Sequence, residues 1–173
     1  MKKIFIILTI ILSLILMAGC VNDSSYEAPE DEGEDIPEEP LMAPDFELET
    51  LDGSVIKLSK LRGKNVILNF WYTGCTFCVI EMPDLQKLQE TYKDDLLLLT
   101  INVGESKEVV EEFLEENKLN LTVLLDQKMN VAYDYGIRSF PTTIAVNKKG
   151  EVIGGYVGML SYEQMEKLYS FFE

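Results

Sequence analysis

The stretch FWYTGCTFCVIEMP, residues 70–83, contains two of the three cysteines in the chain, Cys75 and Cys78. It overlaps a compact apolar run, NVILNFW at 65–71, whose composition predicts a strand buried on both faces. After Cys75, apolar residues recur at helical spacing as far as about Tyr92. The pair therefore lies where a buried strand turns into a helix. Unpaired N–H groups and the positive end of the helix dipole favour a thiolate there, and thiol pKa values in such settings fall from about 8.5 to roughly 3.5–7.5.

Three kinds of site fit a Cys-x-x-Cys pair: a structural disulfide, half of a metal site, or two reactive thiols. A disulfide that closes so small a loop restrains the unfolded chain little, so a structural disulfide would add little stability here. An oxidising compartment would nevertheless permit one. A closed zinc site lacks ligands, because the chain has no second pair and no histidine. The pattern favours a redox pair in which Cys75 attacks a substrate disulfide and Cys78 resolves the mixed disulfide. Glu81 follows Cys78 by three residues and is a candidate base for it, although on spacing alone an exposed helix glutamate is the more ordinary interpretation.

Residues 1–19 have the pattern of an export signal. Two lysines precede an apolar run of 14 residues from Ile4 to Met17, and small residues follow. A membrane span needs about 20 apolar residues, so the alternative of a transmembrane anchor fits less well. The pattern resembles a bacterial lipoprotein signal, which implies lipidation of Cys20 and a place on the outer face of the cell membrane. The alternative is a buried or free Cys20.

Residues 20–44 continue from that cysteine as an acidic segment. From residue 21 to residue 44 it has nine acidic side chains, four prolines and no lysine or arginine. Such a composition cannot bury a core, so we expect a disordered tether. Residues 45–173 carry 21 acidic and 13 basic side chains, which argues against nucleic acid as a partner because phosphate binding needs basic patches. Their length suits one domain with one core.

Strand and helix patterns alternate along residues 45–173. Two short strands, 46–50 and 55–58, flank the turn signal Asp52-Gly53 and predict an N-terminal hairpin. The remaining expected elements are, in chain order, the strand 65–71, the helix 75–92, the strand 96–103, the helix 106–117, the strand 121–126, the helix 129–135, the hairpin 142–158 and the helix 162–172. This order predicts an α/β sandwich with a mixed central sheet.

From Ala43 onward the chain resembles the exported or membrane-tethered thioredoxin-fold reductases of the TlpA/ResA type. The stretches that carry the resemblance are APDFELETLDGSVIKLSKLRGKNVILNFW, CTFCVIEMPDL and VLLDQKMNVAYDYGIRSFPTTIAVNKKGEVI. They cover nearly all of the expected domain. The resemblance implies a thioredoxin-like fold in which residues 104–126 form a helix and a strand inserted into the minimal fold.

The resemblance also implies roles for single residues. Pro141 matches the family's cis-proline, which faces the dithiol, and Phe140 would offer backbone hydrogen bonds to a bound substrate chain. Trp71 is predicted as a further substrate contact. Glu81 falls where these reductases carry an active-site glutamate. Asn69 stands where cytoplasmic thioredoxins have a buried aspartate, so that proton route is expected to be absent.

One position departs from the family pattern. The family usually has tryptophan directly before the first cysteine, and here that position is Gly74. We expect the loss of a flat aromatic ring beside Cys75 to open the site. Thr76 and Phe77 between the cysteines are also uncommon.

Together these features predict a monomeric, membrane-tethered disulfide reductase with a redox disulfide Cys75–Cys78 and with no cofactor or bound metal. The resemblance implies a transmembrane electron donor of the CcdA/DsbD type, and exported clients such as apocytochrome c or methionine sulfoxide reductase. One alternative is a peroxiredoxin-like thiol peroxidase. Such enzymes need a Pro-x-x-x-Thr-x-x-Cys stretch, but here Leu68 occupies the proline position and Tyr72 the threonine position. Another is a copper-binding lipoprotein of the same fold, which would need a Cys-x-x-x-Cys pair and a distant histidine that the chain lacks.

Overall fold

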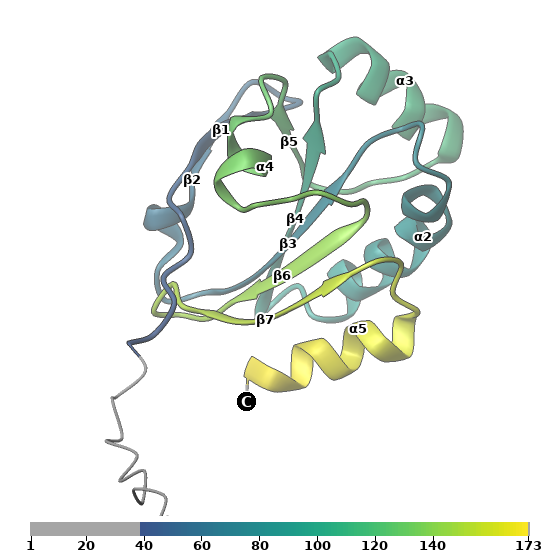
Figure 1. Ribbon diagram of the computed structural model, residues 1–173. Coiled ribbons are helices and arrows are strands. Elements are labelled where there is room, and N and C mark those ends of the chain that lie inside the picture. Colours follow the sequence, from purple (N-terminus) through teal and green to yellow (C-terminus); the bar gives the residue numbers. More distant parts are fainter. Residues whose placement is uncertain (1–38, 173) are drawn as a thin grey trace, which may run out of the picture. The chain divides into compact units, whose positions relative to one another are not determined.

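The computed structural model describes residues 39–172, so the predicted signal, Cys20 and most of the predicted tether lie outside the described residues. Within them, seven strands form one mixed sheet in the order β2-β1-β5-β4-β3-β6-β7 (Figure 1). The strands are β1 (Glu47–Thr50), β2 (Val55–Lys57), β3 (Asn65–Trp71), β4 (Leu96–Val103), β5 (Val123–Asp126), β6 (Thr142–Val146) and β7 (Val152–Val157). The helices are α2 (Thr76–Thr91), α3 (Lys107–Asn117), α4 (Asn130–Asp134) and α5 (Tyr162–Tyr169), with 3-10 turns η1 (Leu58–Leu61) and η2 (Ser170–Phe172).

The centre of the sheet is parallel and its margins are antiparallel. β3 pairs in parallel with β4, and β4 with β5, whereas β6 runs antiparallel to β3 and β1 antiparallel to β5. Parallel neighbours place their carboxyl ends at the same edge of the sheet, so the segments that follow β3 and β4 meet there. That edge holds the cysteine pair.

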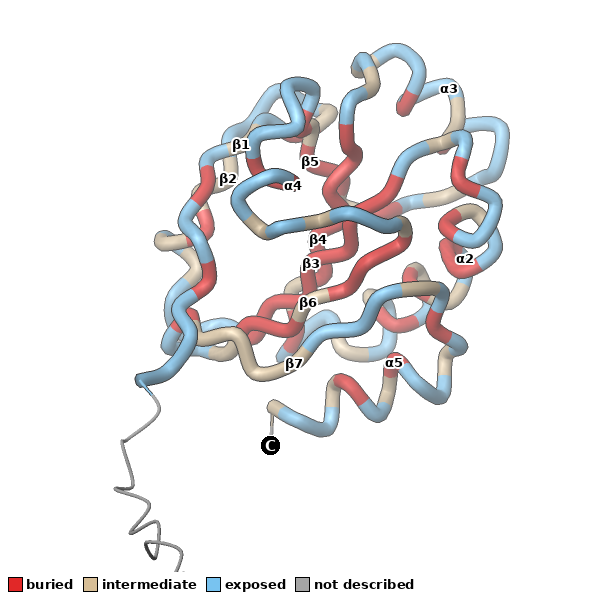
Figure 2. Tube along the Cα trace, in the orientation of Figure 1, coloured by how far each residue is buried: buried red, intermediate tan, exposed pale blue. Residues whose placement is uncertain are grey.

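Helices cover both faces of the sheet. One core cluster joins the sheet to α2, α3 and α5, and the other joins it to α4 and η1. Figure 2 shows the buried residues concentrated in the central strands, with the outer sides of the helices exposed. The predicted thioredoxin-like α/β sandwich is confirmed, including the inserted helix and strand, which are α3 and β5.

Contacts with the folded part also involve residues just before 45, the predicted start of the domain. Met42 forms an isolated antiparallel bridge with Glu151, and the Ala43 N–H donates to the Gly150 carbonyl at 3.0 Å. These contacts lie beside the amino end of β3, because Val66 pairs with Val146 just before the turn that leads into β7. The chain therefore enters the domain at the end of β3 remote from the cysteines.

Within residues 39–172, no helix is both long enough and apolar enough to span a membrane.

Candidate active site

The site is built around a disulfide between Cys75 and Cys78, whose Cα atoms are 5.2 Å apart. Cys75 caps the N-terminus of α2, and its sulfur accepts a hydrogen bond from the Cys78 N–H at 3.2 Å. Unpaired N–H groups at this end of a helix stabilise negative charge on such an atom. Cys75 is 7 % exposed and Cys78 is 0 % exposed, so Cys75 is the more accessible of the two residues to an incoming group.

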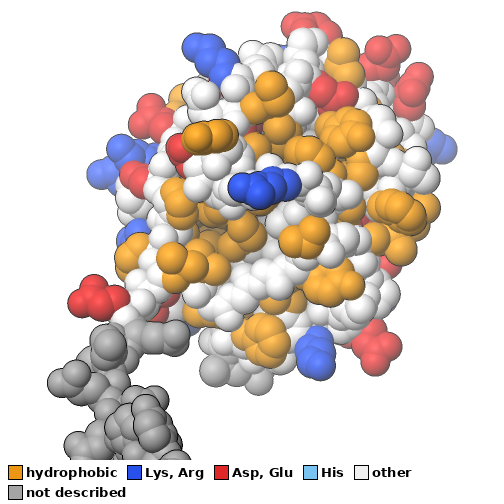
Figure 3. Space-filling model, in the orientation of Figure 1, with side chains coloured by type: hydrophobic (Ala, Val, Ile, Leu, Met, Phe, Trp, Pro, Cys, Tyr) orange, Lys and Arg blue, Asp and Glu red, His pale blue; other side chains and the backbone are white. Residues whose placement is uncertain are grey.

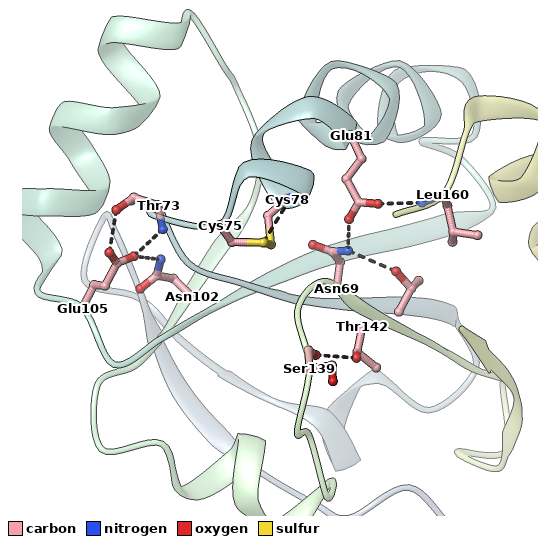
Figure 4. Close-up of a disulfide and its surroundings, with 11 residues drawn as sticks. Asn69, Thr73, Cys75, Cys78, Glu81, Asn102, Glu105, Ser139, Thr142 and Leu160 are labelled. Carbon is pink, nitrogen blue, oxygen red and sulfur yellow. Dashed lines mark hydrogen bonds between the residues drawn. A yellow bond between two sulfur atoms is a disulfide. The ribbon is translucent and has the colours of Figure 1, made fainter. Parts of the chain in front are cut away.

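Glu81 lies on the buried side of α2. Its side chain is 1 % exposed, so the interpretation as an exposed helix glutamate is wrong. One carboxylate oxygen accepts from the Asn69 amide at 2.8 Å and the other from the Leu160 N–H at 2.9 Å. Figure 4 shows the carboxylate held between these two donors, which come from β3 and from the segment before α5. The bonds anchor the helix that carries the cysteines to the sheet and to the C-terminal part of the domain.

Burial raises the pKa of Glu81 from 4.5 to about 7. The Leu160 N–H and the Asn69 amide act in the opposite direction, because both stabilise the ionised form, while the nearby Asp84 raises the pKa further. A carboxyl with a pKa near neutrality both takes up and releases a proton readily at neutral pH. The geometry thus places a proton-exchanging group one helical turn beyond Cys78.

Asn69 connects Glu81 to the strand next to β3. Its side-chain amide donates to both Glu81 and the Thr143 hydroxyl, the latter at 3.0 Å, while its carbonyl oxygen is buried without a partner. If Glu81 is protonated, rotation of this amide brings the unpaired oxygen into position to accept the new O–H. Asn69 is therefore compatible with both protonation states of Glu81.

A second carboxylate lies on the other side of the disulfide, and sequence reasoning missed it. Glu105 accepts the Thr73 N–H at 2.8 Å, the Thr73 hydroxyl at 2.5 Å and the Asn102 amide at 2.7 Å (Figure 4). Thr73 follows β3 and Glu105 follows β4, so the shared edge of two parallel strands was the signal that could have found the pair. The three bonds fix the turn that presents Cys75.

The Phe140–Pro141 peptide bond is cis, as the resemblance implied. Because Phe70 pairs with Thr142, these two residues lie beside the end of β3. The Phe140 ring packs edge to face against Tyr72, with ring centroids 5.3 Å apart. The segment before β6 is thereby brought to the turn before Cys75.

Trp71 does not have the predicted role. Its side chain is fully buried and packs against Phe113 of α3 with ring centroids 5.3 Å apart, and its indole N–H has no partner. Ile67, Asn69 and Trp71 share the face of β3 that packs in the core cluster with α2, α3 and α5. The prediction that Trp71 contacts substrate is wrong, because its side chain packs in the core and does not reach the surface.

Gly74 lies next to the aromatic ring of Tyr72, and the expected opening of the site at this position stays a prediction. A Cβ atom at Gly74 would lie 3.1 Å from the Tyr72 ring. The ring of Tyr72 therefore lies beside the position at which the family usually carries tryptophan.

In the described part of the chain, no group of three or more His, Cys, Asp or Glu side chains is placed to hold a metal ion.

A Cys-x-x-Cys disulfide capping a helix, with a cis-proline beside the preceding strand, defines a thioredoxin-fold dithiol oxidoreductase. Residues 41–154 match the model of the AhpC/TSA family. The chain is 37 % identical over 127 residues to the thiol-disulfide oxidoreductase ResA of Halalkalibacterium halodurans, covering 73 % of this chain and 72 % of that one. The chain thus belongs to the AhpC/TSA family and, within it, to the ResA/TlpA-like thiol-disulfide oxidoreductases.

Two solved structures extend the similarity. One is a putative thiol:disulfide interchange protein DsbE from Chlorobium tepidum, 28 % identical, with a TM-score of 0.72 over 78 % of this chain and 97 % of that one. The other is the pneumococcal exposed lipoprotein thioredoxin Etrx1 from Streptococcus pneumoniae, 29 % identical, with a TM-score of 0.64 over 73 % of this chain and 98 % of that one.

Proposed function

We propose that this oxidoreductase works as a disulfide reductase on exported proteins, tethered by a lipid on Cys20 to the outer face of the cell membrane. The observation that carries the reaction is the difference in exposure between the two cysteines of the disulfide, since Cys75 is 7 % exposed and Cys78 is fully buried. The tether rests on the sequence of residues 1–44 and on the similarity to a structure described as an exposed lipoprotein thioredoxin.

The reaction begins from the dithiol state. The Cys75 thiolate attacks one sulfur of a substrate disulfide, which forms a mixed disulfide and releases the other substrate sulfur as a thiolate. Cys78 gives up its proton, with Glu81 as the acceptor, and its thiolate attacks the Cys75 sulfur. The second substrate thiol leaves, and the Cys75–Cys78 disulfide remains, as in the structure. Two electrons pass from the protein to the substrate.

The disulfide must then be reduced again for a further cycle. A transmembrane donor of the CcdA/DsbD type would supply the two electrons, because no reducing thiol pool is available outside the membrane. The proposed clients are apocytochrome c or an exported methionine sulfoxide reductase. Phe140 and Pro141, beside the turn that presents Cys75, are the proposed contacts for the substrate chain.

Reduction of insulin disulfides in the presence of dithiothreitol tests the reaction. The mature chain should accelerate it, and Cys75→Ser should abolish the acceleration; full activity in Cys75→Ser would refute the assignment. Cys78→Ser should accumulate a mixed disulfide on Cys75, and identifying the trapped protein in cells would name the client.

The role of Glu81 has its own test. If Glu81 accepts the proton of Cys78, release of the mixed disulfide should accelerate as the pH rises through about 7, the value near which Glu81 loses its own proton. Glu81→Gln should be slower and should lose that inflection. An identical pH profile in the variant would leave Glu81 with a purely structural role.

A further inference from the structure

The surface around Cys75 is apolar and partly aromatic. Tyr72, in the turn between β3 and α2, is 37 % exposed, and Phe77 in the first turn of α2 is more exposed still. Met159, which precedes the Leu160 that binds Glu81, is also exposed. Figure 3 shows hydrophobic side chains reaching the surface across the middle of the face that carries β6, with a Lys or Arg side chain near its centre and other charged groups toward its margins.

Tyr72 has a special place in this surface because it contacts both segments that frame the dithiol. Its carbonyl accepts the Cys75 N–H at 3.2 Å, so the residue belongs to the turn that presents the nucleophile. Its ring meets Phe140 at a centroid distance of 5.3 Å and an interplanar angle of 83°, an edge-to-face contact. Phe140 is the residue of the cis peptide bond proposed to contact the substrate chain.

A side chain at position 74 would meet the Tyr72 ring, whereas the backbone of Gly74 is outside the left-handed region that disfavours side chains. Apart from the chain neighbours of Gly74, the atoms of the described residues within 4 Å of a Cβ placed there are those of the Tyr72 ring, at 3.1 and 3.5 Å. A side chain at position 74 would therefore need the Tyr72 ring to give way by a few tenths of an ångström. The two residues form one unit, in which the ring comes from position 72.

We propose that Tyr72 is a specificity-determining residue of this reductase: its ring, seated over Gly74 and against Phe140, selects protein disulfides that have an aromatic or large apolar side chain next to the reacting cysteine. The proposal deepens the proposed function and rests on it. The ring of a residue that is 37 % exposed and that packs against Phe140 is a suitable partner for a second aromatic group. Such a contact does not alter the sulfur chemistry, so its effect should be confined to substrates that carry the matching side chain.

The test compares two disulfide peptides that differ only by phenylalanine or serine next to the cysteine, with hydroxyethyl disulfide as a small reference substrate. The wild type should reduce the phenylalanine peptide with a kcat/KM higher by about threefold to tenfold, the range that one aromatic contact supplies. Tyr72→Ala should lose this preference, so that its kcat/KM falls more for the phenylalanine peptide than for the serine peptide or hydroxyethyl disulfide, whereas Tyr72→Phe should retain the preference. Tyr133→Ala, which removes a tyrosine that is 84 % exposed on α4, is the matched control.

A double variant tests the link between the two positions and does not depend on the folding of Tyr72→Ala alone. Gly74→Trp should lower the melting temperature, because the new Cβ lies 3.1 Å from the Tyr72 ring and the ring must shift to accept it. Adding Tyr72→Ala should recover part of that loss and restore the preference for the phenylalanine peptide through the tryptophan ring.

The outcomes separate the two proposals. Equal rates for both peptides in the wild type, an unchanged preference in Tyr72→Ala, or additive effects of the two substitutions would each overturn the role of Tyr72. A wild type that reduces neither the peptides nor hydroxyethyl disulfide would overturn the proposed function, and this inference with it.

Discussion

Replacing Glu81 with glutamine is expected to remove most of the pH dependence of stability between pH 4.5 and about pH 7, the limits set by the pKa of Glu81 in the unfolded and folded chain. Across this window the folded protein keeps a proton that the unfolded chain has released. Stability is therefore complete below pH 4.5 and falls as the pH rises through about 7, where the folded protein also loses the proton.

The magnitude follows from the size of the shift. Each unit of pKa difference corresponds to about 1.4 kcal/mol, so ionisation of Glu81 should lower the free energy of unfolding by about 3 kcal/mol. The side chain is almost completely buried, so solvent does little to reduce the effect. Glutamine stays neutral at every pH. The glutamine oxygen still accepts the Leu160 N–H. Once the Asn69 amide rotates, its unpaired oxygen accepts a hydrogen bond from the new glutamine amide.

The assay is urea denaturation of the disulfide form at several pH values from 4 to 8. Wild type and Glu81→Gln should diverge by about 3 kcal/mol over this range, with the variant gaining relative to wild type as the pH rises. Glu90→Gln, an exposed glutamate on the same helix, serves as the control and should follow the wild type. Parallel curves for wild type and Glu81→Gln would refute the inference that the buried carboxyl titrates near neutrality.

Three further substitutions test the surroundings of the dithiol. Glu105→Ala leaves the half-buried Thr73 N–H and the buried Asn102 amide without their acceptor, so it should lower the free energy of unfolding by about 1–3 kcal/mol and slow the attack of Cys75 in stopped-flow measurements. Glu115→Ala, at an exposed position of α3, should do neither. Asn69→Asp places a second carboxyl against Glu81 and should cost about 3 kcal/mol or more at pH 8 by denaturation, with little loss at pH 4. Trp71→Phe removes an unpaired buried N–H along with some side-chain volume, so it should change the free energy of unfolding by about 1 kcal/mol or less. A loss near the roughly 3–5 kcal/mol expected for Trp71→Ala would mean that the indole nitrogen has a hydrogen-bond partner.

The elements of the fold could be predicted because their signals are local. The apolar runs of β3 and β4 are bounded by glycines and charged residues, and both strands have the predicted limits. The start of the domain could not be found in this way. Leu41 and Met42 are held by Glu151 and Val152, more than a hundred residues along the chain, and a short proline-flanked acidic segment gives no sign of such a bridge.

The active site also has some features that local sequence patterns predict and others that depend on residues far away in the sequence. The spacing of Cys75 and Cys78 and the helix after them indicated a redox pair, and the resemblance indicated Glu81. Whether Glu81 is buried depends on Asn69 across the sheet and on the Leu160 N–H, which is 79 positions away in the sequence. The position of the Tyr72 ring depends on a side-chain torsion and on Phe140, and no spacing rule encodes either.

The bridge between Met42 and Glu151 fixes the point at which the incoming chain joins the domain, away from the dithiol. It holds the incoming chain at the amino end of β3, whereas Cys75 follows the carboxyl end, and seven residues of strand place the two about 20 Å apart. Any change in the length of the segment before residue 39 would alter how far Cys75 can travel from an anchoring point, yet would leave the surroundings of the sulfur untouched. In the proposed lipid-anchored form, tether length and substrate choice can therefore vary independently of one another.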